Sequence, residues 1–247
     1  MVVHVWGYID KFGQPIPRTF DCWSVPYNRP LLLASKRVLP DSQFESLLRA
    51  CSMISFRYNV IGSQPTSEQE RVYNAVAEKV SRNQIADSTG IVRALAAIYP
   101  SDEAFRSAFA EKILRTTQTR NKRVVRYILC ELEKRLSNVE LDFDSDSFNV
   151  EHVLPENPET GWDAFSEDEL DALVFRLGNM TLLASGPNRD IGNAAYVIKR
   201  PVFTGSGFEI TRKLAADNAD WNPERVAARQ NWMATQATTI WRIDALS

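Results

Sequence analysis

A change of pattern near residue 148 constrains the fold of this chain more than any other feature of the sequence. Two short apolar runs, Phe148–Leu154 and Met180–Leu183, have the length of strands, and Pro155 ends the first of them. Gly178-Asn179 supplies a turn just before the second run, and helical spacing follows over Asn188–Lys199. We therefore expect a strand, a long insertion, a second strand and a helix, in that order.

The long insertion between the two expected strands contains a helix signal. Its Ser166-Glu167-Asp168-Glu169 sequence predicts a capping box, which begins a helix running to Phe175. Nine residues separate Asn179 from Asn188, which is enough to cross one strand and reach the first turn of the following helix. We therefore expect Asn188 to face His152 across the hairpin.

The rest of the chain has mainly helical spacing. Residues 1–26 fit a short hairpin or an ordered arm, and so abrupt a beginning is typical of the C-terminal part of a longer protein. Ser67-Glu68-Gln69-Glu70 predicts a second capping box. Helices are expected over about 41–58, from 67 onward, and over about 88–98, 102–116 and 121–136. The pattern predicts a mainly helical α+β protein.

We divide the chain into two regions on this basis. Residues 1–100 form a mostly helical N-terminal region, and residues 101–247 form a second domain. The strand, strand and helix unit at about 148–200 is the core of that second domain, and a helical domain surrounds it.

Composition excludes several classes of protein. With 44% hydrophobic and 10% aromatic residues, the chain of 247 residues is globular rather than disordered. The sequence lacks both an apolar run long enough for a membrane span and the layout of a secretion signal, so we expect a cytoplasmic protein without a membrane partner. Cys22, Cys51 and Cys130 have no CxxC spacing, which argues against a disulfide framework and against a zinc knuckle.

Charge is distributed unevenly along the chain. Residues 140–171 contain twelve of the 31 acidic residues and no lysine or arginine. All 29 basic residues and the other 19 acidic residues lie outside this stretch, so the rest of the chain is positive although the net charge is −2. Basic residues cluster at Lys112, Arg115, Arg120, Lys122, Arg123 and Arg126, and again at Lys199, Arg200, Arg212 and Lys213. Such clusters can hold phosphates. Solvated helix faces that balance the acidic stretch explain them equally well.

The acidic stretch also invites comparison with a calcium-binding loop. Asp142, Asp144 and Asp146 alternate as the first ligands of such a loop do. However, Ser147 stands where the loop needs glycine, and Val153 stands where it needs glutamate. We therefore interpret these aspartates as a solvated loop.

Histidine is rare in this chain. His4 and His152 are its two histidines, and His4 is expected to be structural or exposed. A hydrolase with a histidine base would therefore depend on His152, which follows the carboxylate of Glu151. Taken alone, a histidine before a Leu-Pro turn is more often a packed side chain, and asparagines near a helix start are usually caps.

The motifs taken together resemble a known family. Glu151-His152-Val153-Leu154-Pro155, Leu177–Leu183 and Pro187–Asn193 are similar to the HNH, or His-Me finger, endonucleases, and most similar to the C-terminal nuclease domain of GmrSD-type (type IV) restriction enzymes. In that family an [E/D]HxLP motif precedes a GNLTLL motif and a helix that bears an asparagine. The resemblance covers roughly residues 100–247, and residues 20–85 resemble the preceding helical region less specifically. Further similar positions are Arg126–Leu129, Glu131–Glu133, Lys199, Trp221–Arg225, Arg229-Gln230 and Trp241.

The resemblance implies a ββα-metal core and a role for each motif residue. His152 would be the general base, and Glu151 and Asn188 would bind one divalent metal ion, for which such oxygen ligands favour Mg²⁺ or Mn²⁺. Asn179, which belongs to the catalytic motif, would pin the loop opposite His152. The supporting or phosphate-binding positions would be Asn193, Lys199 and Arg189. The stretch Ala184–Pro187 lacks the CxxC site of many HNH proteins, so no zinc is expected.

The resemblance also implies an activity and partners. We expect a metal-dependent DNA endonuclease of a restriction or anti-phage defence system, acting on DNA that includes modified phage DNA. Full-length relatives carry an NTP-dependent domain, and no P-loop is visible here, so we expect that domain on a longer protein or on another subunit. Two alternatives stay open: a non-catalytic DNA-binding or assembly module of a larger NTP-dependent complex, and a ribonuclease.

Overall fold

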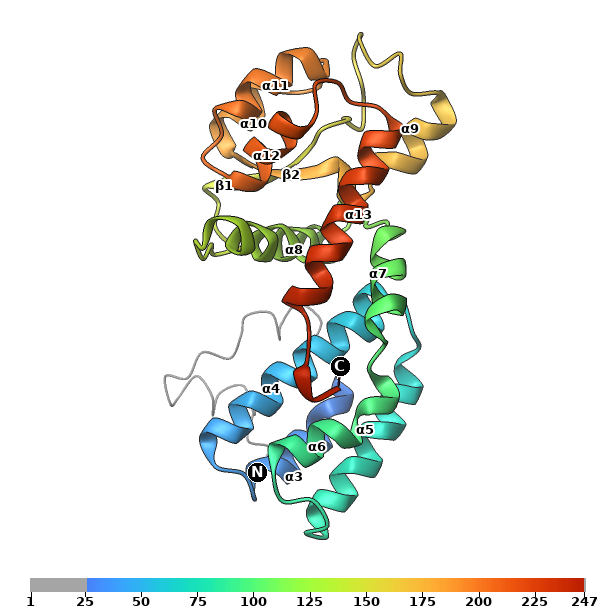
Figure 1. Ribbon diagram of the computed structural model, residues 1–247, viewed down its shortest axis with the longest axis vertical. Helices are drawn as coiled ribbons and strands as arrows, with labels where there is room; N and C mark the ends of the chain where they lie inside the picture. Colours follow the sequence, from blue (N-terminus) through green and yellow to red (C-terminus); the bar gives the residue numbers. More distant parts are fainter. Residues whose placement is uncertain (1–25, 247) are drawn as a thin grey trace. The chain divides into compact units, whose positions relative to one another are not determined.

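The computed structural model describes residues 26–246, which are mainly helical and include a small two-stranded sheet (Figure 1). The mainly helical α+β class is therefore confirmed. The N-terminal hairpin or arm predicted for residues 1–26 falls almost entirely outside the described residues, as do His4 and Cys22. Among the described residues, no helix combines the length and apolar character needed to cross a bilayer.

The chain forms two compact units. One unit contains the described residues up to Phe105 together with those from Trp241 onward, and the other is Arg106–Ile240. The first unit contains these elements: η1 Pro26–Asn28, α3 Arg29–Lys36, α4 Asp41–Ser55, η2 Phe56–Ile61, α5 Thr66–Ser81, α6 Ser88–Ala94, η3 Ala96–Ile98 and η5 Asp244–Leu246.

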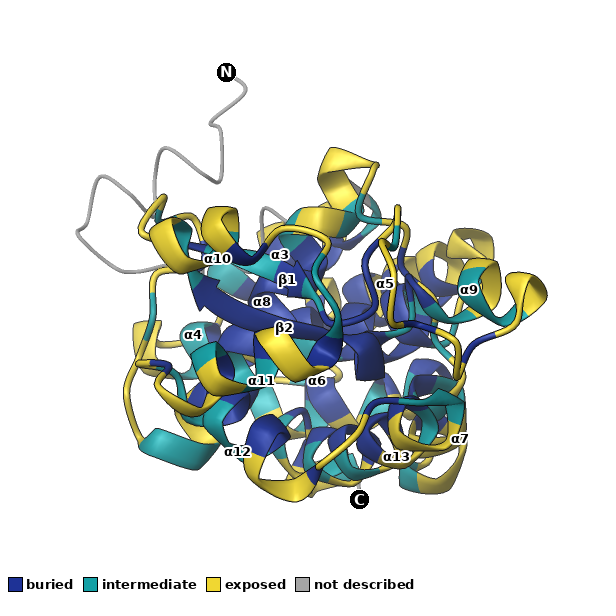
Figure 2. Ribbon diagram, turned by 90° about the horizontal axis from the view of Figure 1, so that it is seen from above, coloured by how far each residue is buried: buried dark blue, intermediate teal, exposed yellow. Residues whose placement is uncertain are grey.

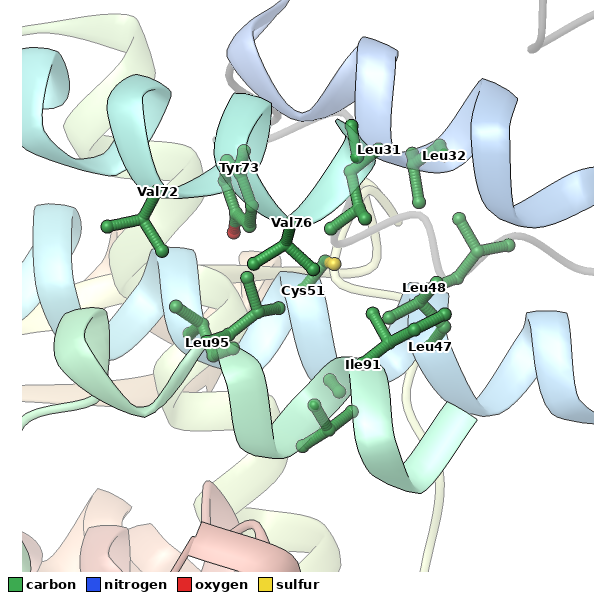
Figure 3. Packing of buried hydrophobic residues seen from close by; sticks show 14 of the residues in the cluster. Leu31, Leu32, Leu47, Leu48, Cys51, Val72, Tyr73, Val76, Ile91 and Leu95 are labelled. Carbon is green, nitrogen blue, oxygen red and sulfur yellow. The ribbon is translucent and has the colours of Figure 1, made fainter. Parts of the chain in front are cut away.

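The core of the first unit lies between α3, α4, α5 and α6. Leu31, Leu47, Cys51, Tyr73 and Ile91, which come from these four helices, are fully buried, and their side chains converge in Figure 3. Close packing of this kind is the main source of stability for short helices, because isolated helices of this length are marginal in water.

Two predicted details of the first unit are wrong. The capping box at Ser67 does not form, because α5 begins one residue earlier, at Thr66, and no side chain caps its first turn. Instead the carboxylate of Glu68 pairs with the guanidinium of Arg71 at 2.6 Å. The helix expected to end at about residue 58 continues as a six-residue π-helix, η2, to Ile61.

The second unit holds the two strands. Its elements, beginning with a helix that spans the boundary between the units, are α7 Asp102–Ala110, α8 Thr119–Ser137, β1 Phe148–His152, α9 Glu167–Leu173, η4 Leu177–Asn179, β2 Met180–Ala184, α10 Ser185–Ile191, α11 Tyr196–Thr204, α12 Glu209–Asp217 and α13 Pro223–Ile240. The capping box of α9 is present, with the side chain of Ser166 accepting from the backbone of Glu169. Strands β1 and β2 pair antiparallel, with Glu151 opposite Thr181.

The hairpin is packed on both sides. Helix α8 contacts both strands, and Val125, Ile128 and Leu129 on its apolar face are buried. Helix α10 follows β2 directly and contacts both strands too. Figure 2 shows the strands largely buried and much of α10 exposed. The hairpin therefore packs against the buried apolar face of α8 and against α10, which faces solvent on its other side.

Two helices predicted in this unit have the wrong extent. The helix expected over 102–116 ends at Ala110, because Ile113 forms an antiparallel bridge with Arg176. The single helix expected over Asn188–Lys199 is instead two helices, α10 and α11. Gly192 separates them with φ of 44°, a left-handed conformation that glycine adopts without strain.

Candidate active site around Glu151 and His152

The Glu151 carboxylate is the centre of the candidate site. Glu151 lies on β1 and is buried. Its Oε1 accepts a hydrogen bond from Lys199 Nζ at 2.6 Å, and its Oε2 accepts one from Asn188 Nδ2 at 3.2 Å. The sequence motifs on β1, α10 and α11 therefore meet at one carboxylate, and these three elements lie together in Figure 1.

The order of elements explains how Asn188 reaches Glu151. The antiparallel hairpin places β2 beside β1, and α10 begins at Ser185, immediately after β2 ends. Asn188 is the fourth residue of α10, so its side chain lies in the first turn. This is the spacing across one strand that the sequence predicted for Asn188, although the structure brings it against Glu151.

Lys199 is a buried cation rather than a surface one. Its side chain has no exposed area, and Nζ also donates to the backbone oxygen of His152 at 3.0 Å. The ring of Trp162 lies 6.0 Å from Nζ. The resemblance implies a supporting or phosphate-binding role for Lys199, and in the structure its ammonium holds the carboxylate of Glu151 and the end of β1.

His152 is the last residue of β1 and is partly buried. Its Nε2 lies 3.0 Å from the hydroxyl oxygen of Thr116, and the ring of Phe175 meets the imidazole edge to face, with centroids 5.8 Å apart. Its Nδ1 has no hydrogen-bond partner among the residues described here and is not sealed from solvent. One ring nitrogen is therefore held by the protein and the other is open to a ligand or water.

The surroundings of His152 favour its neutral form. Burial, followed by the positive charges of Lys199 and Lys122, lowers the pKa of His152 to about 4. At neutral pH the imidazole therefore has a free lone pair. Burial also raises the pKa of Glu151, and the ammonium of Lys199 and the amide of Asn188 oppose that rise.

Asn179 holds the loop that follows β1. Its Oδ1 accepts from the backbone N–H of Leu154 at 2.8 Å, and its Nδ2 donates to the backbone oxygens of Leu154 and Val174 at 2.8 and 3.0 Å. The indole N–H of Trp221 donates to the same Oδ1 at 3.1 Å. The side-chain amide of Asn179 is fully buried, and both its oxygen and its nitrogen are hydrogen-bonded. It therefore fixes the backbone just after His152.

The turn before β2 requires a glycine. A Cβ on Gly178 would lie 2.2 Å from the backbone oxygen of Val226, so α13 approaches this turn too closely for any side chain. Arg229 on α13 donates to the backbone oxygens of Gly178 and Met180, at 2.7 Å each, and Gln230 accepts from the N–H of Gly178 at 3.0 Å. Helix α13 therefore positions the turn that carries Asn179.

Arg189 and Asn193 lie away from these contacts. Both are exposed, and their side chains make no hydrogen bond to any residue in the described part of the chain. The structure brings together Glu151, Asn188 and Lys199, places His152 next to them on β1, and leaves Arg189 and Asn193 on the surface.

The basic cluster between residues 112 and 126 divides into two kinds of residue. Arg126 is buried and donates to three backbone oxygens around residues 143–148, and Arg123 pairs with Asp144 at 2.8 Å. In contrast, Arg115 and Lys122 are exposed and pair with no acidic residue that the structure describes. Arg115 lies over the ring of Phe175, 5.2 Å from its centroid, and Lys122 acts on the pKa of His152. These two cations, which pair with no acidic residue in the described part of the chain, therefore add positive charge to the surroundings of the candidate base.

Sequence reasoning missed two contacts of His152. Thr116 lies 36 residues before His152, and Phe175 lies 23 residues after it. Neither residue belongs to a motif. The segment containing Thr116 was expected to be the end of a helix. A pairing of Ile113 with Arg176 brings both residues to the imidazole, and no local pattern signals that pairing.

The donor set around Glu151 is small. Within residues 26–246, no group of three or more His, Cys, Asp or Glu side chains is arranged to hold a metal ion. The oxygen donors that converge are the carboxylate of Glu151 and the amide of Asn188. Such a site would leave most positions around an ion to water or substrate.

Comparison with known protein families gives a match. The family model described as "GmrSD restriction endonucleases, C-terminal domain" matches residues 99–236. A search of curated proteins finds none that matches the chain. The matched range contains both strands, Asn179, Asn188 and Lys199.

Proposed function

The chain belongs to the family of GmrSD restriction endonuclease C-terminal domains, and from that premise we propose that it is an HNH-type, metal-dependent DNA endonuclease of a restriction system. The family is one of restriction-type nucleases. The finer proposal is that β1, β2 and α10 form a ββα-metal core, in which His152 is the general base and Glu151 and Asn188 are the metal ligands.

One observation carries this proposal: Glu151 and His152 are neighbours at the end of a strand, and each has the contact that its role requires. Glu151 meets Asn188 from the helix that follows β2, at 3.2 Å. His152 is fixed through Nε2, while Nδ1 is left open. A general base needs a neutral nitrogen that is within reach of water.

The residues present fit a magnesium or manganese ion. Glu151 and Asn188 would hold such an ion through oxygen atoms, the ligands that these cations prefer. The amide of Asn188 has an oxygen and a nitrogen of nearly the same shape, so a half rotation exchanges them. Its oxygen would then lie about as far from Glu151 Oε2 as its nitrogen does now, 3.2 Å. A carboxylate and an amide are ligands that these hard cations accept.

The residues of this chain divide the reaction between them. His152 takes a proton from the attacking water at Nδ1, and its lowered pKa keeps the imidazole neutral at neutral pH. Lys199 orients the carboxylate of Glu151 and opposes the rise in its pKa that burial causes. A bound Mg²⁺ or Mn²⁺ ion would stabilise charge on the phosphorus centre and on the leaving oxygen. Glu151 and His152 are successive residues of β1, and successive strand residues point to opposite faces of a sheet. To meet both side chains, the scissile phosphate has to lie across the end of β1.

Two exposed cations support DNA as the substrate. Arg115 and Lys122 are unpaired within the described residues and lie beside His152 or its neighbour Phe175. Cations in this position gain affinity for a nucleic-acid backbone by releasing counterions. We further propose an NTP-dependent domain or subunit as the partner that delivers DNA, which includes modified phage DNA.

A second function has one observation in its favour. Both oxygens of Glu151 are hydrogen-bonded by side chains of this chain, Lys199 and Asn188. A site satisfied in this way is compatible with a DNA-binding or assembly module whose nuclease is silent until a partner acts. This module is the alternative to the enzyme.

Plasmid cleavage tests the two functions. Supercoiled DNA is incubated with Mg²⁺, Mn²⁺ or EDTA and with wild type, His152→Ala or Asn188→Ala, and the same plasmid transcribed into RNA is tested in parallel. The enzyme predicts metal-dependent nicking that falls roughly 10²- to 10⁴-fold in His152→Ala. Equal cutting by all three proteins would exclude His152 as the base. DNA binding without cutting by wild type and variants alike favours the module, and cutting of RNA alone favours a ribonuclease.

A further inference from the structure

We infer that Thr116 is a positioning residue for the reaction: its hydroxyl accepts a hydrogen bond from Nε2–H of His152 and so fixes the tautomer in which Nδ1 carries the reactive lone pair. This inference rests on the proposed function, because it assigns a partner to the proposed base. It concerns the neutral imidazole and which of its two nitrogens carries the proton.

The first step of the argument is the contact itself. Thr116 Oγ1 lies 3.0 Å from His152 Nε2, which is a normal hydrogen-bond length. No other partner is recorded for that hydroxyl among the residues that the structure describes, and none for His152 Nδ1. A neutral imidazole has one donor and one acceptor nitrogen, and the partner of one nitrogen determines the state of the other.

The second step is that Thr116 belongs to a fixed segment. Between α7 and α8, Ile113 pairs with Arg176, and the N–H of Leu114 donates to the backbone oxygen of Phe175 at 3.0 Å. Gln230 donates to the backbone oxygen of Lys112 at 2.9 Å. The bridge to the chain just before η4 and the bond from α13 therefore hold the residues just before Thr116.

The other end of the segment is fixed as well. The backbone oxygen of Arg115 accepts from the N–H of Gln118 at 3.2 Å and from the side chain of Asn121 at 3.2 Å. The guanidinium of Arg115 also packs on Phe175, which contacts the imidazole. The hydroxyl of Thr116 is thus presented to His152 from a segment that is tied at both ends, as a positioning group requires.

The third step concerns direction. The charged groups around the imidazole are Lys199, whose Nζ bonds the backbone oxygen of His152, Lys122 from α8, and Glu151 from the same strand. None of them hydrogen-bonds to a ring nitrogen. Thr116 is therefore the one described side chain that hydrogen-bonds to the ring. A threonine hydroxyl can accept or donate, and because Nδ1 is the nitrogen open to water, the role of base requires the hydrogen on Nε2 and the Thr116 oxygen as its acceptor. Donation from Nε2–H leaves the open Nδ1 as the acceptor for a proton from water.

The test reads the tautomer directly by NMR. The chain has two histidines, so selective ¹⁵N-histidine labelling gives two imidazoles, and His152→Ala assigns them. Long-range ¹H–¹⁵N correlation spectra at neutral pH distinguish a pyrrole-type nitrogen, which carries hydrogen, from a pyridine-type nitrogen, which does not. Spectra are recorded for wild type, Thr116→Val, Thr116→Ser and the control Thr235→Val, an exposed threonine of α13 that bonds its own helix.

The inference predicts one pattern. Wild type, Thr116→Ser and Thr235→Val show a pyrrole-type Nε2 and a pyridine-type Nδ1, while Thr116→Val shows averaged nitrogens. In the cleavage assay kcat falls about tenfold in Thr116→Val, as the loss of one orienting hydrogen bond implies, with KM unchanged and the rate restored by serine. A wild-type Nδ1–H tautomer, or a tautomer unchanged in Thr116→Val, would overturn the inference. If the spectra are as expected but the wild type cuts no DNA, the hydrogen bond from His152 to Thr116 is supported and the nuclease proposal is refuted.

Discussion

Lys199 Nζ lies 2.6 Å from Glu151 Oε1, and both side chains are buried. A buried carboxylate loses its hydration, and a close ammonium that is also hydrogen-bonded compensates for that loss. The pair links α11 to β1, so it orients the proposed metal ligand at the same time as it stabilises the second unit.

Removing the ammonium should destabilise the protein strongly. Lys199→Met keeps most of the side-chain volume but leaves the carboxylate of Glu151 buried without its partner, a change that costs about 3 to 5 kcal/mol. Urea unfolding measures it. The double variant Glu151→Gln/Lys199→Met should recover part of the loss because it removes the charge as well. The control Lys213→Met breaks an ion pair with the exposed Asp217 and should cost less than about 1 kcal/mol.

Metal binding should depend on Asn188. Asn188→Ala removes one of two proposed ligands and should weaken Mn²⁺ binding roughly tenfold, which is about 1.4 kcal/mol. Asn188→Asp adds a charged oxygen and should bind Mn²⁺ at least as tightly as wild type. Electron paramagnetic resonance of free Mn²⁺ measures both. Asn193→Ala is the matched control, since Asn193 is exposed and, among the described residues, makes no hydrogen bond to Glu151. Equal affinities in all four proteins would exclude Asn188 as a ligand.

DNA affinity should depend on salt through the two unpaired cations. Each phosphate contact contributes about 0.9 to the slope of log affinity against log salt concentration. Lys122→Gln and Arg115→Gln should therefore each lower the slope by about that amount, measured by fluorescence anisotropy. Arg123→Gln makes the same change of charge at a side chain that is already paired with Asp144, and its slope should change less. Equal slopes for the three variants would mean that the position of a cation relative to His152 does not affect the salt dependence of DNA binding.

The metal-free protein should become less stable as the pH is lowered, because the pKa of His152 is lower in the folded state than in the unfolded state. In the unfolded chain its pKa is about 6.5, while burial and two lysines lower it to about 4 in the folded state. Between these values the unfolded state binds more protons, so acidification favours unfolding by up to about 3 kcal/mol. Urea unfolding in EDTA at pH 7.5, 6 and 5 measures this. His152→Gln should show a weaker dependence, and identical dependences would show that His152 titrates normally in the fold.

Patterns local to the chain predicted most of the elements in the second unit. Apolar runs of strand length placed β1 and β2 to within two residues, and the Ser166 capping box placed α9. The boundaries failed where another part of the chain intervened. Helix α7 stops at Ala110 because the following residues pair with Arg176, and the break at Gly192 depends on a backbone conformation that helical spacing does not reveal.

The sequence by itself determined the hairpin, the helix after it and the identity of the residues that meet there. Those features follow from short-range rules: alternation and length for strands, a glycine turn, and nine residues from Asn179 to Asn188. Only the tertiary structure decided the state of each group. It buried Lys199 against Glu151, and it brought Thr116 to Nε2 of His152 from 36 residues upstream. Burial and contacts between distant segments set the charge, tautomer and orientation of a side chain, and these depend on how the whole unit packs.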